Sequence, residues 1–220
     1  MSFNQKYWVV GLVYFALNFS VNAQGDAEIG KLKTMACMGC HGPTGNSFLP
    51  MFPSLAGQPA GYIAKQIQDF KEADRRNATM TSIALGINEA DTQHIGAFYE
   101  SQIKTPIVKN ITHLKTDAEK TALLTLGKKL YDNGNADTGQ AACFVCHGKN
   151  GDALVELNVP NLANQPPQYL ISTLNEFKNR KRTNDGERVM RRIIDTMSSE
   201  QIEAVAYYSS YLVPTLEEKK

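Results

Sequence analysis

The sequence predicts an all-α protein built from two tandem copies of one domain. The pentapeptide Cys-x-x-Cys-His occurs twice, at residues 37–41 and 143–147, and it uses all four cysteines of the chain. A longer repeat surrounds these motifs at an offset of about 107 residues, which is too long for a solenoid unit and indicates duplicated domains. Because no segment alternates apolar and polar residues over a useful strand length, the regular elements are expected to be helices.

Residues 1–23 are predicted to form a cleaved export signal. They carry Lys6, an apolar run from Tyr7 to Phe19 and a small-residue cleavage site ending at Ala23. The run of about 13 residues is shorter than the ~20 that a membrane-spanning helix needs. An uncleaved membrane anchor is the alternative, and no later segment is apolar enough to cross a membrane.

The chain that remains after export is formally neutral. Removing residues 1–23 leaves 22 basic and 22 acidic residues, and this balance argues against nucleic acid as a partner. Cysteines in an exported protein usually suggest disulfides. Here all four cysteines belong to the two Cys-x-x-Cys-His motifs, so no cysteine is left over for a disulfide.

Each Cys-x-x-Cys-His motif is typical of a site where haem c is attached covalently. The two thiols are three residues apart, so one helical turn presents both to the vinyl groups of a porphyrin. The predicted attachment residues are Cys37, Cys40, Cys143 and Cys146. The next residue, His41 or His147, is expected to bind the iron as the proximal ligand. Dithiol exchange and a zinc site are the alternatives, and the histidine after each second cysteine disfavours both.

The first copy is expected to contain three principal helices. An opening helix at 26–36 leads into the haem motif, and a Pro/Gly-rich loop separates the motif from a helix at 61–71. A second loop carries Met80. The closing helix at 89–101 follows Asn88, which is a good N-cap residue.

The second copy repeats this order. Helices are expected at 117–131, 168–178 and 199–212, the last with Ser198 as its N-cap and with Met190 in the preceding loop.

The domain boundaries follow from the two copies. We expect an N-terminal domain at 24–105, a linker at 106–116 and a C-terminal domain at 117–220. The linker begins at Pro106 and is rich in threonine, lysine and asparagine.

The distal iron ligands are predicted from the match between the copies. Met80 and Met190 stand 39 and 43 residues after their histidines and match each other across the repeat. Thioether ligation raises the haem potential relative to bis-histidine ligation. Met197 matches an isoleucine and is predicted to be a core residue, although it is the alternative ligand in the second copy. His94 and His113 have no counterpart in the repeat and are expected to have surface or packing roles.

Pro53 and Pro160 recur twelve and thirteen residues after the proximal histidines. Either proline could serve only to stiffen its loop. Because a proline recurs at this place in both copies, we predict instead that its carbonyl accepts the other ring N–H of the histidine and fixes the orientation of the ring.

These residues resemble the dihaem cytochrome c4 family over essentially the whole exported chain. Besides the two haem motifs, its specific marks are Phe-Pro-x-Leu-Ala-Gly-Gln at 52–58 and Arg-Thr-Asn-Asp-Gly at 182–186. The resemblance implies two class I cytochrome c-like domains, each wrapped around a haem with His/Met ligation. It also implies a periplasmic electron carrier, often loosely associated with the membrane, that feeds terminal oxidases. Asn164 replaces the glycine of the first copy, so that loop is expected to differ slightly.

The predicted function is electron relay without a small-molecule substrate or catalytic residues. Two covalently bound haem c groups with both axial positions filled leave no iron site open for a substrate. The expected donor is a protein such as a quinol–cytochrome c reductase, and the expected acceptor is one such as a terminal oxidase. The alternative is a dihaem subunit of a dehydrogenase such as flavocytochrome c sulfide dehydrogenase. A peroxidase-like enzyme would need a five-coordinate iron.

A basic cluster surrounds Met190. Its members are Lys178, Arg180, Lys181, Arg182, Arg188, Arg191 and Arg192. The cluster is either a solvated face or a docking rim that steers an acidic partner.

Overall fold

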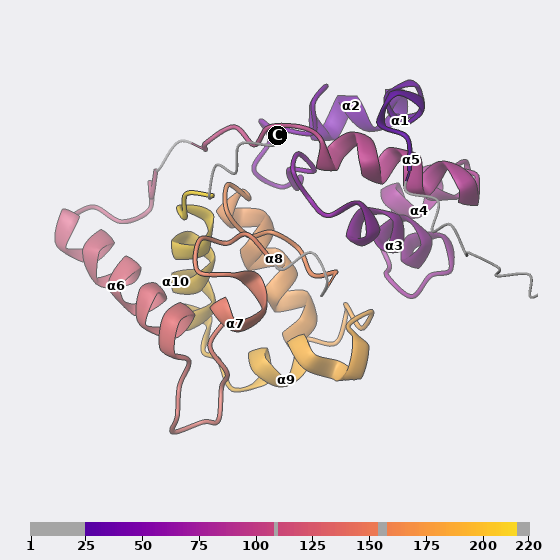
Figure 1. The fold of residues 1–220 in the computed structure, drawn as a ribbon. Helices are drawn as coiled ribbons and strands as arrows, with labels where there is room; N and C mark the ends of the chain where they lie inside the picture. Colours follow the sequence, from indigo (N-terminus) through magenta and orange to yellow (C-terminus); the bar gives the residue numbers. More distant parts are fainter. Residues whose placement is uncertain (1–24, 108–109, 154–157, 215–220) are drawn as a thin grey trace, which may run out of the picture.

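The computed structural model describes residues 25–107, 110–153 and 158–214. The predicted export signal at 1–23 lies outside these ranges. Helices α1 to α5 form one lobe and α6 to α10 form the other (Figure 1). Over the described ranges the chain forms no strand, only two isolated backbone bridges. The predicted all-α class is confirmed.

The principal helices lie in the predicted order, but the segments that carry Met80 and Met190, which were predicted to be loops, are the short helices α4 and α9. In the N-terminal lobe they are α1 (Ala27–Lys33), α2 (Met35–His41), α3 (Ala60–Lys71), α4 (Ala78–Leu85) and α5 (Glu89–Glu100). In the C-terminal lobe they are α6 (Asp117–Asn133), α7 (Phe144–His147), α8 (Pro167–Lys178), the 3-10 turn η2 (Gly186–Arg188), α9 (Val189–Asp195) and α10 (Ser199–Ser210). The predicted helices at 61–71, 89–101, 168–178 and 199–212 correspond to α3, α5, α8 and α10.

The predicted opening helix at 26–36 is wrong in one respect, because it is two helices. The chain turns at Thr34, whose φ and ψ are −92° and 2° and whose hydroxyl donates to the Lys31 carbonyl at 2.8 Å. A threonine hydroxyl that bonds to nearby backbone competes with continued helix. In the second copy α6 is continuous to Asn133, and a loop at 134–143 separates it from α7.

Each opening helix crosses the closing helix of its lobe at a glycine. A Cβ atom on Gly30 would lie 1.9 Å from the carbonyl oxygen of His94, and one on Gly127 would lie 2.2 Å from that of Ala204. Since only glycine permits this approach, the α1–α5 and α6–α10 crossings are equivalent features of the two copies.

Each lobe has its own apolar core between the crossing helices. The N-terminal core contains Ile63, Ile67, Phe70, Ala84, Ile95, Phe98 and Tyr99. The C-terminal core contains Leu130, Ile194, Met197, Ile202 and Val205. Met197 is 1% exposed, as predicted for a core residue.

The two lobes meet through matching polar contacts made by two buried glutamines. Gln58 donates from Nε2 to the Asn161 carbonyl at 2.8 Å and accepts from the Asn161 N–H at 2.9 Å. Gln165 makes the same pair of bonds to the backbone of Ser54, at 2.5 and 3.0 Å. Such reciprocity is the pattern of an isologous interface, here between two copies within one chain.

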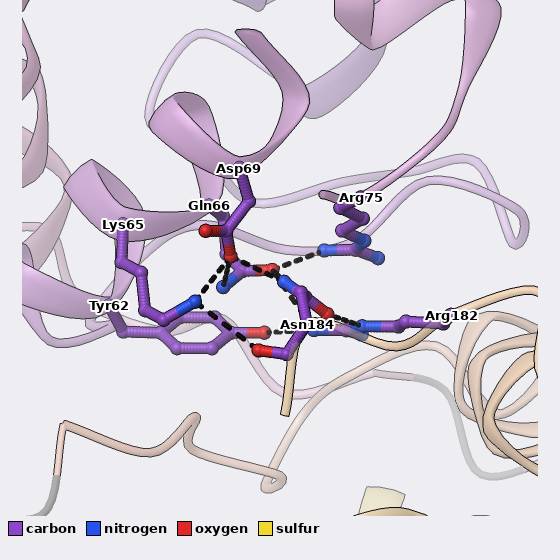
Figure 2. A network of polar contacts seen from close by, with 7 residues as sticks. All are labelled: Tyr62, Lys65, Gln66, Asp69, Arg75, Arg182 and Asn184. Carbon is purple, nitrogen blue, oxygen red and sulfur yellow. Dashed lines mark hydrogen bonds and ion pairs between the residues drawn. The ribbon is translucent and has the colours of Figure 1, made fainter. Parts of the chain in front are cut away.

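A second group of interface contacts centres on two buried arginines. Arg75 donates to the Gln66 Oε1 at 2.9 Å and to the Tyr169 hydroxyl of the other lobe at 3.1 Å. Arg182 donates to the same Gln66 oxygen at 3.0 Å and to the Tyr62 hydroxyl at 3.3 Å. Figure 2 shows Arg75, Arg182 and Tyr62 around Gln66.

The same network holds the segment that leads towards α9. The Asn184 side chain donates from Nδ2 to the Asp69 Oδ2 at 2.5 Å. The backbone carbonyl of Asn184 accepts from Lys65 Nζ at 3.3 Å (Figure 2). Residues 182–184 of the C-terminal lobe are therefore held by α3 of the N-terminal lobe.

In the part of the chain that the structure describes, no helix combines the length and the apolar character needed to cross a membrane.

Candidate haem-binding sites

Both Cys-x-x-Cys-His motifs end on short helices whose last residue is the histidine. Cys37, Cys40 and His41 lie on α2, whereas Cys143 precedes α7, on which Cys146 and His147 lie. Each helix ends at a glycine with positive φ, 82° at Gly42 and 74° at Gly148. A Cβ atom would also clash there, at 2.3 and 2.0 Å from the carbonyl oxygens of Asn46 and Asp152. The four cysteines of the two motifs are partly buried and form no disulfide with one another.

His41 and His147, the predicted proximal ligands, each place one ring nitrogen against a proline carbonyl. His41 Nδ1 lies 2.9 Å from the Pro53 carbonyl oxygen, and His147 Nδ1 lies 2.8 Å from that of Pro160. A carbonyl can only accept, so Nδ1 carries the proton and donates in both rings. Nε2 is therefore left with a free lone pair, the form that binds a metal.

The surroundings of His41 fit an iron ligand. Burial lowers the pKa of both His41 and His147, and the bond to the proline carbonyl opposes this only in part. Among the described residues, nothing hydrogen-bonds to the buried His41 Nε2. A buried unpaired nitrogen costs about 1–3 kcal/mol. Coordination of haem iron at Nε2 removes this cost, so the residues present fit a haem attached at the adjacent thiols.

Two tyrosines lie beside the motifs, and the repeat does not relate them to each other. Tyr99 of α5 is fully buried, and burial raises its pKa and that of the nearby Cys37 thiol. Tyr131 of α6 donates to the Gly148 carbonyl at 2.6 Å. Burial also raises the pKa of the Cys143 thiol to about 11. Tyr99 lies on the closing helix of its lobe and Tyr131 lies on the opening helix of the other. Aligning the two copies therefore does not pair them, and the alignment could not show that each haem motif has a buried tyrosine beside it.

Met80 and Met190 are both partly buried and lie one helix before the closing helix. Met80, on α4, packs against the N-terminal core, as does Cys37. Met190, on α9, packs against the C-terminal core. Each methionine therefore faces the interior of its own lobe.

The segments that precede these methionines differ between the copies. Asn77 accepts from the Met80 N–H at 3.0 Å and caps α4. Before Met190, Glu187 and Arg188 both have positive φ, 51° and 57°. Two successive left-handed non-glycine residues are uncommon. The sequence comparison aligned the methionines without indicating this turn.

The predicted basic cluster is largely occupied by internal contacts. Arg182 is 6% exposed and belongs to the lobe interface. Arg191 pairs with Asp185 and Arg180 pairs with Asp195, each at 2.6 Å. Lys178 donates to the backbone of Met197. The exposed members are Lys181, Arg188 and Arg192, together with Arg180, which is exposed despite its ion pair.

The remaining histidines have packing and surface roles, as expected. His94 Nδ1 accepts from the Asp26 N–H at 2.8 Å and ties the start of α1 to α5. His113 Nε2 lies 2.8 Å from a Glu203 carboxylate oxygen.

Gln58 and Gln165 contact the loops beside the two motifs, and the sequence did not predict a role for either of them. They stand 107 residues apart, at the ends of the matching loops that contain Pro53 and Pro160. Their recurrence at a constant offset was the available signal. Their partners could not be inferred because each bond joins residues more than 100 positions apart.

Comparison with known proteins shows the family to which the chain is similar. The family model described as Cytochrome c matches the chain twice, at residues 27–119 and 124–211. Cytochrome c4 of Thiocapsa roseopersicina is 38% identical over 186 residues, which cover 84% of this chain and 91% of that protein. The crystal structure of reduced recombinant cytochrome c4 from Pseudomonas stutzeri is similar with a TM-score of 0.78 and 34% identity. It covers 86% of this chain and 100% of its own.

A relative with a different description is also similar. It is described as the thiosulfate dehydrogenase electron acceptor of Stutzerimonas stutzeri strain A1501. It is 33% identical over 175 residues, which cover 79% of this chain and 77% of that protein.

Proposed function

Because this chain belongs to the dihaem cytochrome c4 family, we propose that it relays electrons between periplasmic redox proteins through two His/Met-ligated haems. The family establishes a dihaem electron carrier, not an enzyme, with two covalently bound haem c groups. We propose, in addition, which residues bind each iron and which proteins donate and accept the electrons.

We assign one haem to each motif. Cys37 and Cys40 hold the first and Cys143 and Cys146 hold the second, and each bound haem supplies a one-electron redox centre. His41 and His147 bind iron through Nε2, and Pro53 and Pro160 accept their Nδ1 protons. The observation that carries this assignment is the buried His41 Nε2, whose opposite ring nitrogen is already bonded.

Met80 and Met190 complete the two irons in this proposal. Their match across the repeat and their position against the lobe cores support the assignment. With both axial positions filled, neither haem binds a substrate, and the surrounding protein tunes potential and excludes water.

The ligand test is a spectroscopic redox titration of Met80→Ala and Met190→Ala. Each substitution is expected to convert one haem from low-spin to high-spin in the oxidised protein and to lower its potential, while the other haem is unchanged. Met35→Ala is the matched control, because Met35 is 80% exposed beside the first motif. An unchanged spectrum and potential in either ligand variant would refute the assignment in that domain.

The partners are proposed by chemistry. A donor such as a quinol–cytochrome c reductase and an acceptor such as a terminal oxidase are consistent with the family, with loose attachment to the membrane surface. Transfer from a sulfur-oxidising dehydrogenase is the second candidate, and the similarity to a thiosulfate dehydrogenase electron acceptor favours it. Stopped-flow reduction by purified thiosulfate dehydrogenase and by quinol–cytochrome c reductase distinguishes the two, since only the physiological donor reduces the protein within the time of its own turnover.

We also propose periplasmic export with cleavage after Ala23, and domain boundaries at 24–105, 106–116 and 117–220. Amino-terminal sequencing of the haem-loaded protein tests the cleavage. A product that begins at Met1 would show the uncleaved anchor instead.

A further inference from the structure

In each lobe, one peptide group links the proposed proximal histidine to a glutamine of the opposite lobe. In the first, the Pro53 carbonyl oxygen accepts from His41 Nδ1 at 2.9 Å. The N–H of the same peptide group belongs to Ser54 and donates to Gln165 Oε1 at 3.0 Å. Because carbonyl and N–H share one planar, conjugated unit, His41 and Gln165 are joined by a single continuous hydrogen-bonded chain.

The second peptide group repeats the arrangement in the opposite direction. The Pro160 carbonyl accepts from His147 Nδ1 at 2.8 Å, and the Asn161 N–H donates to Gln58 Oε1 at 2.9 Å. The histidine of each lobe is thus connected to the glutamine of the other. No other contact described above joins the lobes in this reciprocal way so close to the iron-binding nitrogens.

The glutamines are held firmly enough to act on these peptide groups. Gln58 and Gln165 are 3% and 4% exposed. Each also donates from Nε2 to the next carbonyl along, that of Asn161 or Ser54, so both side-chain atoms bond to one loop. This two-point contact fixes the amide orientation, with Oε1 facing the peptide N–H.

Hydrogen bonds in such a chain strengthen one another. Donation of the peptide N–H to glutamine increases the negative charge on the carbonyl oxygen of the same group. That oxygen then draws more strongly on the Nδ1 proton, which makes the imidazole a more basic ligand. A more basic imidazole favours ferric over ferrous iron and lowers the haem potential.

We propose that Gln58 and Gln165 are crossed positioning residues, each tuning the proximal histidine and haem potential of the opposite domain. The proposal rests on the iron ligation of His41 and His147 proposed above. It makes the lobe interface a direct part of both redox centres, and it acts in both directions.

The test is a redox titration of the full haem-loaded protein carrying Gln165→Leu or Gln58→Leu, with the two potentials assigned to their domains by NMR. Gln165→Leu is expected to raise the potential of the N-terminal haem and leave that of the C-terminal haem unchanged. Gln58→Leu is expected to do the reverse. In the reduced, diamagnetic state, the Nδ1–H resonance of the opposite histidine is expected to move upfield in each variant.

The control is Tyr62→Phe, which removes an interface hydrogen bond to Arg182 but touches neither peptide group. It is expected to leave both Nδ1–H resonances in place. A shift of the haem in the substituted domain, an equal shift of both haems or no shift in the leucine variants would overturn the proposal. A failure of the proposed iron ligation would be seen separately, because the wild-type protein itself would then show no low-spin haem spectrum.

Gln165→Glu and Gln58→Glu provide a second pair in case the leucine variants do not fold. Each retains an oxygen that accepts the peptide N–H, so the opposite Nδ1–H resonance is expected to stay or to move downfield. An upfield movement in the glutamate variants would contradict the proposal.

Discussion

His41 and His147 are buried bases whose surroundings favour the neutral form. Burial lowers the pKa of His41 and His147 below the ordinary value of 6.5. Below about pH 6.5 the unfolded chain therefore binds more protons at these positions than the folded chain. Stability is then unaffected above this pH and decreases as pH falls from it towards the depressed folded-state pKa.

This sign predicts that the free energy of unfolding decreases between about pH 7 and pH 5 at constant ionic strength. Urea unfolding of the haem-loaded protein at a series of pH values measures it; the proposed iron bond at Nε2 acts in the same direction as burial, because it also excludes a proton from the folded-state imidazole. The variant His94→Gln/His113→Gln is the control, because it removes the two other histidines and is expected to retain the dependence. A flat profile over this window would show that these imidazoles gain no protons on unfolding, contrary to the prediction.

At the scale of elements, the helix crossings at Gly30 and Gly127 define the lobes. We predict that Gly30→Ala and Gly127→Ala each lower the free energy of unfolding by about 1–3 kcal/mol or more, as overpacking does. The reason is that the added Cβ would meet a backbone carbonyl at 1.9 or 2.2 Å, and backbone cannot move aside as a side chain can. Denaturant unfolding measures the loss.

Gly39→Ala is the matched control for these substitutions. Gly39 lies on α2, and no described atom would lie within 4 Å of its Cβ. Alanine has the higher helix propensity, so this variant is expected to be neutral or more stable by up to about 1 kcal/mol. Equal losses in all three variants would show that the crossings are not the cause.

The closing helices begin at matched positions with different caps. The Ser198 side chain accepts from the Gln201 N–H at 3.1 Å in a capping box, whereas the Asn88 side chain makes no cap bond to the described residues. We predict that Ser198→Ala destabilises the protein by about 1 kcal/mol, and that Asn88→Ala has a much smaller effect. Thermal unfolding of both variants tests this, and an equal loss would contradict the structural difference.

The helices could be predicted largely because they are repeated. The segment at 61–71 and its copy at 168–178 share Tyr and Phe positions at one offset, so each supports the other. The breaks could not be predicted in this way. The turn at Thr34 depends on a local hydroxyl bond, and the left-handed turn at 187–188 lies where the copies differ in length.

At the scale of the whole molecule, the motifs indicated the cofactor sites but not the lobe interface. The prediction that Pro53 and Pro160 face the histidines needed only local spacing and agrees with the observed contacts. The glutamine and arginine contacts join distant positions, and polar residues carry no periodic pattern that reveals a partner. A buried polar interface is therefore the part of such a fold that a single sequence predicts least.

The arginine network makes a prediction about how the two lobes unfold. Gln66 Oε1 accepts hydrogen bonds from Arg75, Arg182 and Asn184, so it serves both buried guanidinium groups and the C-terminal lobe at once. Gln66→Leu removes this oxygen and leaves charged donors buried without it. Because such donors are costly when unpaired, we expect a loss on the order of 3 kcal/mol in the coupling between lobes.

Calorimetry of the haem-loaded protein measures this coupling. The wild type is expected to unfold in one cooperative transition, and Gln66→Leu in two, because each lobe retains its own core and haem. The control is Thr173→Val at the equivalent position of the second copy: its side chain bonds to Tyr169 and, among the described contacts, accepts no bond from either arginine. If Gln66→Leu and Thr173→Val both retained a single transition, contacts other than the arginine network would couple the lobes. The hydrogen bonds of Gln165 to Ser54 and of Gln58 to Asn161 would then be the remaining candidates.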